Sequence, residues 1–327
     1  MDVLVTGIGG QDGYYLSELL LRQGHTVCGI YRSDHSVHLL EPLANQYGQS
    51  LVLIRGDAMD PAFLRRLIVE AEPRYIYNLA AQSRVGESFR FPVQTIQVNA
   101  LVPLYILETI RECNPKIRFF QACSSEIFGE CPPVPQNEDT PLAPLSPYAV
   151  SKASAYWLVK TYRRAFDLFA CNAILYNHES PLRDQSFLSG KVVRAVAEIL
   201  NGRQTVLTLG NLDVKRDWGF AGDYVEAMRL MMEQPEARDY IIATGETHSV
   251  GEFVEIAFAH VGLDWQKYVQ VDEKLLRPVD AHLMMGDATL ARQTLGWQPR
   301  CDFRRLVALM VDAAVAHSTV ATQVGQE

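Results

Sequence analysis

Four residues near the middle of the 327-residue chain have side chains suited to moving protons. Tyr148 and Lys152 are four positions apart, so on a helix they would lie on one face. A free tyrosine has a pKa of about 10, and a neighbouring ammonium favours the phenolate, which would make a base that works near neutral pH. Ser124 could orient a substrate hydroxyl beside this pair, and Glu126 adds a carboxylate. We therefore predict that these four residues are catalytic.

The surrounding sequence predicts the elements that position these side chains. The apolar run 117–122 is typical of a buried strand, and the serine and the glutamate follow its end. Ser146 suits a helix N-cap and Pro147 suits the first helical position, so a helix that carries the tyrosine and the lysine is expected to begin there. A tyrosine with a lysine over its edge also occurs on ordinary amphipathic helices, so the pair alone does not identify an active site.

A glycine-rich turn near the N-terminus favours the catalytic interpretation. The run 3–6 predicts a buried strand, a helix is expected over 14–22, and glycines recur between them with the spacing G-x-x-G-x-x-G. Such a turn lets the backbone approach a pyrophosphate and directs a helix N-terminus at its charge. A plain glycine-rich turn between a strand and a helix is the alternative. We predict a dinucleotide site at Gly7, Gly10, Gln11, Asp12 and Gly13.

The residue that follows the second predicted strand indicates whether the dinucleotide is NAD or NADP. This strand is expected over 26–31, and Arg32 follows it, about 20 residues beyond the glycines. Proteins that select NAD usually carry an acidic residue here for the ribose 2′-hydroxyl, whereas a guanidinium favours the 2′-phosphate of NADP. Asp34 could oppose that phosphate or bind a ribose hydroxyl instead. We predict NADP as the cofactor, with NAD as the less favoured alternative, and Arg32 as a contact.

Further strands are predicted over 51–54 and 75–79, and a helix over 98–111 leads to the strand that precedes the serine. This alternation is typical of a doubly wound parallel sheet, which binds ligands at the carboxyl ends of its strands. Asp57 could reach the adenine edge or cap the next helix. We expect further cofactor contacts from Asp57, Ala58, Leu79, Ala80, Ala81 and Ser83.

The second half of the chain predicts a return to the sheet and a separate lobe. Strands are expected over 170–176 and 240–244, with an amphipathic helix over 224–232 between them. We predict an α/β fold, a doubly wound parallel Rossmann sheet with a smaller C-terminal α/β substrate lobe. The residues from His317 onward are expected to fray. The predicted domains are 1–177 plus 216–247 for the dinucleotide and 178–215 plus 248–327 for the substrate.

Composition and charge exclude several kinds of function. The chain is 48% apolar and long enough to bury a full core, and its formal net charge of −8, with no basic run, argues against nucleic acid as a partner. No apolar run approaches the roughly 20 residues that span a bilayer, and no signal-peptide pattern opens the chain. The six cysteines form no CxxC pair and the histidines show no metal-ligand spacing. We therefore expect reduced thiols, no metal, no membrane contact and a cytoplasmic protein.

Together these motifs resemble those of a known group of enzymes. A serine followed by Tyr-x-x-x-Lys, after an N-terminal glycine-rich turn, resembles the extended, sugar-nucleotide-modifying branch of the short-chain dehydrogenase/reductase superfamily. Several phrases narrow the resemblance to the GDP-mannose 4,6-dehydratase family, over nearly the whole chain. They are Gly-Gln-Asp-Gly at 10–13, Leu-Ala-Ala-Gln-Ser at 79–83, Asn-His-Glu-Ser-Pro at 177–181, Lys-Arg-Asp-Trp-Gly at 215–219, Asp-Tyr-Val-Glu-Ala-Met at 223–228 and Ala-Thr-Gly at 243–245.

The resemblance implies conversion of GDP-mannose to GDP-4-keto-6-deoxymannose by an internal redox cycle. Tyr148 as a phenolate would take the proton of the sugar 4-hydroxyl while hydride leaves C4 for the nicotinamide. Lys152 would lower the pKa of the tyrosine and hold the nicotinamide ribose. Glu126 would remove the C5 proton that the 4-ketone makes acidic, water would be lost from C6, and the hydride would return to C6. No net oxidation would result.

The resemblance also implies a substrate site and an assembly. Asn177 resembles the family's substrate-contacting asparagine, and arginine suits bidentate contact with a diphosphate. For each single cation, a solvated surface charge is the alternative. A homodimer or homotetramer is expected. The cofactor would also contact Tyr148, Lys152 and His178, and the nucleotide sugar would contact Ser83, Ser125, Glu126, Asn177, Arg183, Lys191, Arg216 and Arg277.

The chain departs from the family's pattern mainly where the substrate is expected. Ser124 stands where the family usually has threonine, which keeps the hydroxyl. Ser33 replaces the second of two adjacent arginines, and Gly190 and Gly251 stand where arginines are common. The sequence at 277–282 is Arg-Pro-Val-Asp-Ala-His, whereas the family commonly has Arg-Pro-Ala-Glu-Val-Asp. With fewer cations near the nucleotide, these departures affect the prediction of its base and its sugar more than the prediction of the reaction.

Two other functions are compatible with the same motifs. A 4-ketoreductase or epimerase acting on a nucleotide sugar would keep the fold, the tyrosine and the lysine, but a reductase would consume NADPH. A non-catalytic NADP-binding sensor would keep only the fold, and would be expected to lose Tyr148, Lys152 or Glu126. The chain retains all three, so we favour the dehydratase.

Overall fold

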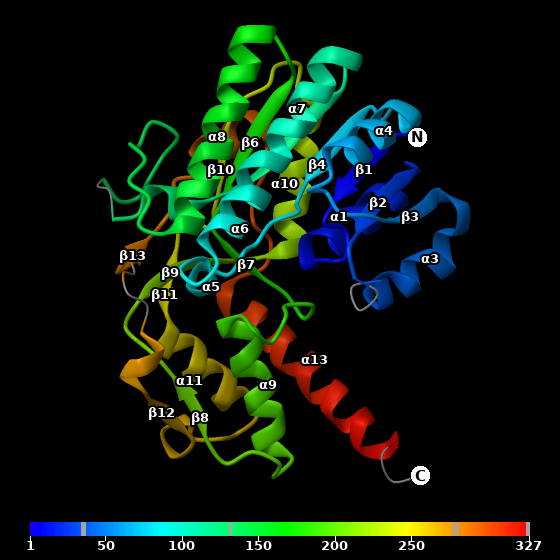
Figure 1. Ribbon diagram of the computed structural model, residues 1–327. Helices are drawn as coiled ribbons and strands as arrows, with labels where there is room; N and C mark the ends of the chain where they lie inside the picture. Colours follow the sequence, from blue (N-terminus) through cyan, green and yellow to red (C-terminus); the bar gives the residue numbers. More distant parts are fainter. Residues whose placement is uncertain (34–36, 131–132, 277–278, 280, 325–327) are drawn as a thin grey trace.

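The structure is a computed structural model that describes residues 1–33, 37–130, 133–276, 279 and 281–324, with the backbone alone over 320–324. Arg277, predicted to contact the substrate, and Asp34, which could oppose the 2′-phosphate or bind a ribose hydroxyl, lie outside the described residues. The chain forms a sheet covered by helices on both faces, with a second lobe beside it that contains the C-terminal helix (Figure 1). None of the described helices is both long and apolar enough to cross a membrane.

Seven parallel strands form the main sheet, in the order β10-β6-β5-β4-β1-β2-β3. The order reverses direction between β1 and β4, and such a switch point opens a crevice outside the carboxyl ends of the strands. The predicted doubly wound parallel sheet is therefore confirmed. The strands are β1 (Val3–Thr6), β2 (Val27–Tyr31), β3 (Leu51–Arg55), β4 (Tyr75–Asn78), β5 (Arg118–Ser124), β6 (Ala170–Leu175) and β10 (Tyr240–Ile242).

Two layers of helices bury the faces of this sheet. The strands are apolar on both sides, as in Val3–Thr6, where all four residues are buried, because both faces are covered. On one face lie α1 (Gln11–Arg22), α10 (Ala221–Glu233) and α12 (Thr289–Leu295). On the other lie α4 (Pro61–Ala71), α7 (Val102–Cys113) and α8 (Pro147–Phe166). Three short helices, α3 (Glu41–Tyr47), α5 (Val85–Ser88) and α6 (Pro92–Ile96), lie in the connections.

The second lobe has an apolar core of its own. Its helices α9 (Leu188–Leu200), α11 (Val250–His260) and α13 (Phe303–Val324) surround buried side chains such as Phe253 and Leu306. The strands β8 (Leu207–Leu209) and β12 (Val269–Val271) pair beside them. A four-stranded sheet joins the two parts of the molecule, since its Met284 belongs to the first core and its Trp218 to the second. Its strands are β7 (Asn177–Glu179), β9 (Lys215–Phe220), β11 (Thr247–Ser249) and β13 (Leu283–Met284).

The structure corrects two predicted elements. The helix expected over 98–111 includes a π-helical turn at Gln97–Leu101, which follows α6 and precedes α7. Fraying from His317 was wrong, because α13 continues as a helix to Val324. The cause is packing along α9: Ser318 is buried, and its hydroxyl accepts a hydrogen bond of 2.9 Å from Asn201.

Candidate active site

The predicted catalytic residues lie at the junction of β5 and α8. Ser124 is the last residue of β5, and the backbone N–H of Glu126 donates to its hydroxyl. The hydroxyl of Ser146 caps α8 by accepting from the N–H of Ala149 (3.1 Å), as the sequence predicted. The Nζ of Lys152 lies 5.9 Å from the ring centroid of the buried Tyr148, which places the pair on one face of the helix.

Burial dominates the electrostatics of this pair. It raises the pKa of Tyr148 above its ordinary value, against the opposing effects of a hydrogen bond with Ser124 and the charge of Arg183. The nearby Glu126 raises the pKa of Tyr148 further, and burial lowers the pKa of Lys152. The lowered tyrosine pKa predicted from the lysine is therefore wrong for the protein alone. A phenolate needs more positive charge beside it than these side chains supply.

A chain of polar groups across three strands fixes the position of Lys152. Its ammonium and the side-chain amide of Gln121 both donate to the carbonyl of Ala122, each at 2.8 Å. Asn78 donates to Gln121 (2.7 Å), and the hydroxyl of Thr6 donates to Asn78 (2.6 Å). Such satisfied buried networks hold their members in one arrangement. Thr6, Asn78 and Gln121 were not among the residues predicted from the sequence, although polar residues within buried apolar strands are a signal that could have indicated them.

A second positioning residue, also missed, lies in the π-helical turn. Asn99 is buried, and its side chain donates to the hydroxyl of Ser151 (2.9 Å), next to the lysine on α8. The same side chain accepts from the N–H of Gln82 (2.8 Å) and donates to its carbonyl (3.0 Å). It thereby connects the loop after β4 to α8. Single π-helical turns often occur at functional sites, but nothing in the sequence pattern of 98–111 indicated one.

The glycine-rich turn has the geometry that a pyrophosphate requires. Gly7 has φ +70°, and a Cβ there would lie 2.8 Å from the backbone nitrogen of Ala80. A Cβ at Gly13 would overlap the backbone of Ile8, so both positions need glycine for packing. At Gly10 an added Cβ would have only the Gly7 carbonyl oxygen nearby, at 3.4 Å, so that side of the turn is open. Because Gly10 also caps α1 without a side chain, the first turn can present its N–H groups to an anion.

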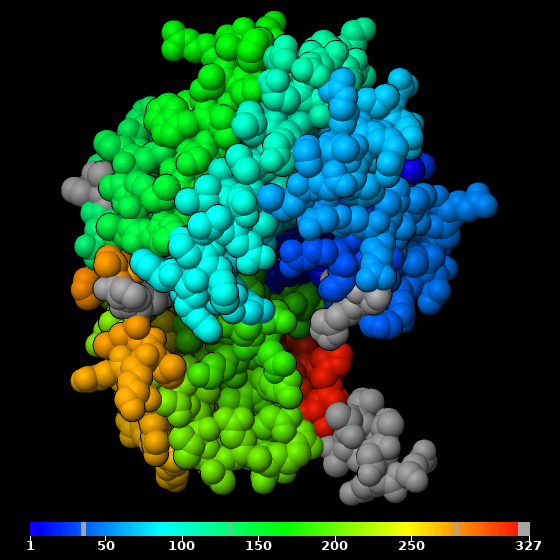
Figure 2. Space-filling model, viewed as in Figure 1, coloured from blue at the N-terminus to red at the C-terminus, as the bar shows by residue number. Residues whose placement is uncertain are grey.

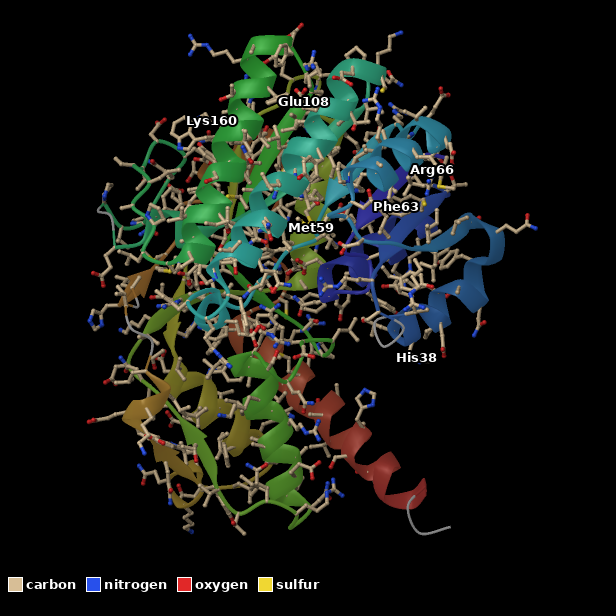
Figure 3. The ribbon with its side chains drawn as sticks, in the orientation of Figure 1. His38, Met59, Phe63, Arg66, Glu108 and Lys160 are labelled. Atoms are coloured by element: carbon tan, nitrogen blue, oxygen red, sulfur yellow. The ribbon has the colours of Figure 1, made fainter. Side chains whose placement is uncertain are left out.

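The other predicted cofactor residues follow the remaining strands at the same edge. Asp57 lies after β3 and accepts from the N–H of Met59 (2.9 Å), while Asp60 caps α4. Figure 3 labels Met59 and, on α4, Phe63, whose ring leaves no room for a side chain at Gly56. After β4, the N–H groups of Leu79 and Ala80 donate to Thr6. Five contacts predicted from the sequence thus follow strands at the carboxyl edge of the sheet: Asp57 and Ala58 after the edge strand β3, and Leu79, Ala80 and Ala81 after β4 at the switch point. Arg32 follows β2 and Ser83 follows β4 at this edge, and both side chains are exposed.

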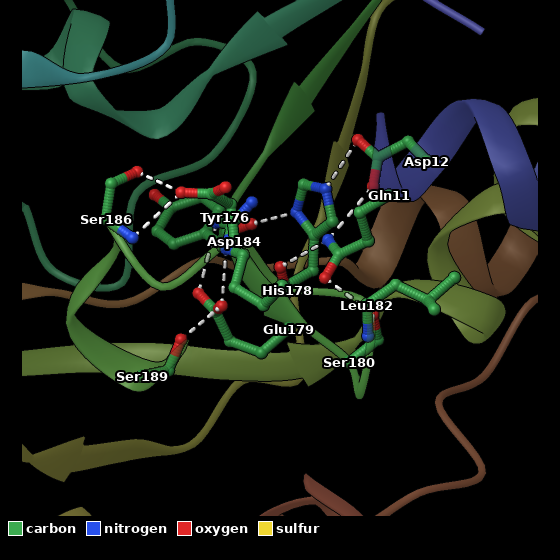
Figure 4. A network of polar contacts seen from close by, with 11 residues as sticks. Gln11, Asp12, Tyr176, His178, Glu179, Ser180, Leu182, Asp184, Ser186 and Ser189 are labelled. Atoms are coloured by element: carbon green, nitrogen blue, oxygen red, sulfur yellow. Dashed lines mark hydrogen bonds and ion pairs between the residues drawn. The ribbon is translucent and has the colours of Figure 1, made fainter. Parts of the chain in front are cut away.

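Figure 4 shows a polar network that connects this turn to β7. His178 lies 2.9 Å from the carboxylate of Asp12, through its Nε2 atom. The amide of Gln11 donates to the carbonyl of His178 (3.0 Å) and accepts from the hydroxyl of Ser180 (2.7 Å). Asp12 has its pKa lowered to about 2 by the nearby His178, against the effect of burial. The network joins residues separated by more than 160 positions in the chain.

Three of the predicted substrate cations lie within the described residues, and each is bound to protein groups. Arg183 forms an ion pair of 2.6 Å with the buried Glu179, and its guanidinium lies 4.0 Å from the ring centroid of Phe187. Arg216 is buried and donates to the carbonyl of Ala281 (2.7 Å). Lys191 is exposed and donates to the carbonyl of Thr208 (2.7 Å). The alternative of a solvated surface charge therefore does not describe Arg183 or Arg216.

The other predicted substrate residues lie close to the junction of the two lobes. Asn177 begins β7, and Ser125 follows β5 and is buried. Figure 2 shows the surface hollowed between the blue N-terminal part and the green and red parts of the second lobe. At the N-terminal part of α9, a Cβ at Gly190 would lie 2.5 Å from the carbonyl oxygen of Asp184. A larger residue at this position would have to displace the loop before α9.

The fold and the site together define a class of protein. A doubly wound parallel sheet, a G-x-x-G-x-x-G turn at its switch point and a buried Tyr-x-x-x-Lys beside a serine are the features of an extended short-chain dehydrogenase/reductase. A family model described as GDP-mannose 4,6 dehydratase matches residues 4–310. The chain belongs to the GDP-mannose 4,6-dehydratase family.

Similar proteins agree with this assignment. The chain is 46% identical to GDP-mannose 4,6 dehydratase 1 of Arabidopsis thaliana, over 94% of this chain and 88% of that protein. It is 44% identical to GDP-mannose 4,6 dehydratase of Homo sapiens, over 95% of this chain and 91% of that protein. Its fold matches UDP-glucose 4-epimerase of Thermus thermophilus in complex with NAD, with a TM-score of 0.82 and 26% identity over 96% of this chain and 99% of that chain. It also matches RMD from Pseudomonas aeruginosa complexed with NADPH, with a TM-score of 0.80 and 22% identity over 97% and 100%.

Proposed function

We propose that this chain converts GDP-mannose to GDP-4-keto-6-deoxymannose, by internal hydride transfer from C4 to C6 with loss of water. Membership of the family supports this reaction, because the relatives of Arabidopsis thaliana and Homo sapiens described above are GDP-mannose 4,6 dehydratases. The observation that carries the proposal is the position of Glu126, whose backbone N–H donates to the hydroxyl of Ser124 (3.3 Å), the same hydroxyl that forms a hydrogen bond with Tyr148. A simple dehydrogenase needs one base, whereas elimination of water needs a second group for the C5 proton.

The four catalytic side chains divide this chemistry among them. Tyr148 takes the proton of the sugar 4-hydroxyl, and Ser124 holds that hydroxyl by a hydrogen bond. Lys152 keeps a positive charge near the tyrosine at a position fixed by the carbonyl of Ala122. A nicotinamide dinucleotide held at the glycine-rich turn would supply the acceptor and later the donor of the hydride, and its oxidised form would supply positive charge. Glu126 removes the C5 proton once the 4-ketone has formed. Of the two protons that Tyr148 and Glu126 have then taken up, one leaves with the C6 hydroxyl as water and the other returns to C5 when the hydride returns to C6.

The cofactor is a nicotinamide dinucleotide, and we infer that it is NADP. Arg32 supports this choice, because its guanidinium follows β2 where NAD-selective proteins usually carry an acidic group. The turn at Gly7, Gly10 and Gly13 would hold the pyrophosphate on the N–H groups of α1. The small residues after β4 would lie against the dinucleotide on the other side of the switch point.

For the substrate, we propose contacts from residues at the junction of the lobes. Asn177 and Ser125 would face the sugar, and Arg183 and Arg216 would meet the diphosphate while keeping their protein partners. An arginine can do both, since its guanidinium has five N–H donors in a fixed fork. Lys191 would contribute a more mobile charge at the edge of this site.

We further propose a division into two domains, a homo-oligomer and a cytoplasmic location. Residues 1–177 plus 216–247 would bind the dinucleotide, and 178–215 plus 248–327 the substrate, although residues 281–297 include side chains that pack in the core of the sheet domain. A dimer or tetramer is supported by an apolar exposed face on α6 and α8. Its exposed side chains include Val93 (68%), Ile96, Val150 and Trp157 (54%).

Mass spectrometry of the purified protein with GDP-mannose and a catalytic amount of NADP would test the reaction. The expected product is lighter than the substrate by one water, with no accumulation of NADPH, because the hydride is returned in each turnover. Steady consumption of added NADPH with a 4-keto nucleotide sugar would show a reductase instead. Binding of NADP with no conversion of any nucleotide sugar would favour a non-catalytic sensor.

A further inference from the structure

An acidic residue lies in the helix turn that is proposed to bind the pyrophosphate. Asp12 lies in the first turn of α1, next to the open side of the glycine-rich turn. A carboxylate is favourable at a helix N-terminus by itself, but it repels a second anion that approaches the same N–H groups. A dinucleotide site with this residue therefore needs a positive charge that compensates for Asp12.

His178 has the contacts of a histidine that carries two protons. Its Nε2 lies 2.9 Å from Asp12 Oδ2, and its Nδ1 lies 2.8 Å from the backbone carbonyl oxygen of Tyr176. Both partners are acceptors, and a neutral imidazole has only one N–H, so an imidazolium is the form that satisfies both contacts. The ring is stacked on Tyr224, with 4.7 Å between the centroids and 23° between the planes, which fixes its orientation.

We propose that His178 is a positioning residue for the cofactor, which as an imidazolium cancels the charge of Asp12 and so permits the pyrophosphate to bind at the turn. The inference rests on the proposed dinucleotide site. It assigns the histidine of β7 a role in cofactor affinity even though its side chain belongs to the strand that joins the two lobes.

The charges around the pair agree with this assignment. Burial and the charge of Arg183 lower the pKa of His178, but Asp12 and the Tyr176 carbonyl outweigh them, so its pKa is raised above 6.5. The guanidinium of Arg183 also lowers the pKa of Asp12. Lys152 on α8 interacts with Asp12 at longer range, and α10 contributes the neutral ring of Tyr224. The pair therefore loses its positive partner as the pH rises through the raised pKa of His178.

A second contact between the same segments provides a control for geometry. Gln11 donates to the carbonyl of His178 and accepts from the hydroxyl of Ser180, and neither interaction involves a charge. Replacing Ser180 with alanine would loosen the connection between the turn and β7 without changing the charge near the pyrophosphate. A role based only on connecting the segments predicts the same effect from this variant as from loss of the histidine.

The test is titration calorimetry of NADP with the wild-type protein, His178→Gln, Asp12→Asn, the double variant and Ser180→Ala. We expect His178→Gln to weaken NADP binding on the order of tenfold, because the carboxylate of Asp12 then lacks its positive partner and repels the pyrophosphate. A like charge at short range typically changes the equilibrium of a neighbouring ionised group by about this factor or more. Asp12→Asn should bind at least as well as the wild type, and the double variant should bind nearly as well as Asp12→Asn. Ser180→Ala should change the affinity by less than threefold, as roughly expected for one neutral hydrogen bond.

The pH dependence gives a second readout that needs no turnover. The ratio of wild-type to Asp12→Asn affinity should fall as the pH rises through the raised pKa of His178, and titration of the 2′-phosphate cancels in this ratio. The same ratio can be measured if His178→Gln does not fold. A flat ratio, or a double variant no better than His178→Gln, would overturn the inference while leaving the cofactor site intact. Absence of NADP binding to the wild type would instead contradict the proposed function.

Discussion

The proposed cofactor half and the proposed substrate half of the site differ in whether their binding groups already interact with other parts of the protein. Around the glycine-rich turn, the chain offers backbone N–H groups at an open surface, and Gly10 has little around it. In the other half, Arg183 is paired with a buried carboxylate and Arg216 with a backbone carbonyl. Substitutions on the open side of the first half should therefore change affinity alone, whereas those in the second half should also change the stability of the fold.

Tyr148 lies between the two halves, and its replacement should give the largest effect. Tyr148→Phe removes the only hydroxyl that can take the proton of the sugar 4-hydroxyl in the proposed mechanism. We expect turnover to fall by about 10²–10⁴-fold, the usual contribution of a general base. The affinity for NADP and the melting temperature should change little, because the ring remains to fill its buried site. Product formation measured by mass spectrometry within tenfold of the wild type would remove the tyrosine from its role.

Arg183→Gln should give the largest effect on stability. The substitution leaves Glu179 buried without its cationic partner, and breaking a buried ion pair from one side typically costs about 3 kcal/mol or more. Chemical denaturation of the protein without ligands measures this loss. The hydroxyl of Ser189 donates to the same carboxylate at 2.6 Å, so the Glu179 side chain keeps one hydrogen-bond partner and the loss of stability should be partial.

A matched pair of variants separates the structural effect from the loss of a phosphate contact. Adding Glu179→Gln to Arg183→Gln should recover most of the stability, because the unpaired charge is then removed. The double variant should still bind the nucleotide sugar more weakly than the wild type does, because the proposed phosphate contact of Arg183 is still missing. Full recovery of substrate binding would assign Arg183 to the fold alone and would remove the difference between the two halves at this residue.

The difference between the halves also explains what the sequence could predict. The catalytic pair, its capped helix and the glycine-rich turn depend on neighbours within a few positions, and Ser146, Tyr148 and Lys152 lie where the local pattern indicated. The parallel sheet followed from regular alternation of strands and helices. These features are local because helix caps and tight turns are set by short-range geometry.

Other features depended on contacts between distant segments and were not predictable in this way. The polar chain through Asn78 and Gln121 and the bond between Asn99 and Ser151 join residues more than 40 positions apart. The raised pKa of Tyr148 results from burial, which spacing on a helix does not reveal. The partners of Arg183 and Arg216 likewise become visible only when β7, β9 and their neighbours are assembled.

A pair of glycine variants in the cofactor half should separate affinity from stability. Gly10→Ala adds a methyl group on the open side of the turn, so we expect the affinity for NADP to fall roughly tenfold with little change in melting temperature. Gly13→Ala should instead destabilise the protein, because its Cβ would overlap the backbone of Ile8. Calorimetry and thermal unfolding measure the two quantities. Equal loss of stability in both variants would show that the turn is packed throughout.

The smallest expected effect concerns the pair that joins the two halves, Asp12 and His178, in the protein without ligands. The pKa of Asp12 is lowered to about 2, so its contribution to stability is present above its unfolded pKa of about 4 and is lost as the pH falls through 2. The pKa of His178 is raised, so its contribution is present below its unfolded value of 6.5 and is lost as the pH rises through the folded value.

The stability gained from the pair should therefore be greatest between about pH 4 and 6.5. We expect Asp12→Asn to lower the melting temperature in this window by roughly 2 °C, for a partly exposed pair worth about 1 kcal/mol, and by less at pH 9. Ser180→Ala, which removes a neutral contact between the same segments, should give a difference that does not depend on pH. If the Asp12→Asn difference were also independent of pH, hydrogen bonding and packing rather than charge would stabilise the contact between the two segments. Charge would then contribute only within each half of the site.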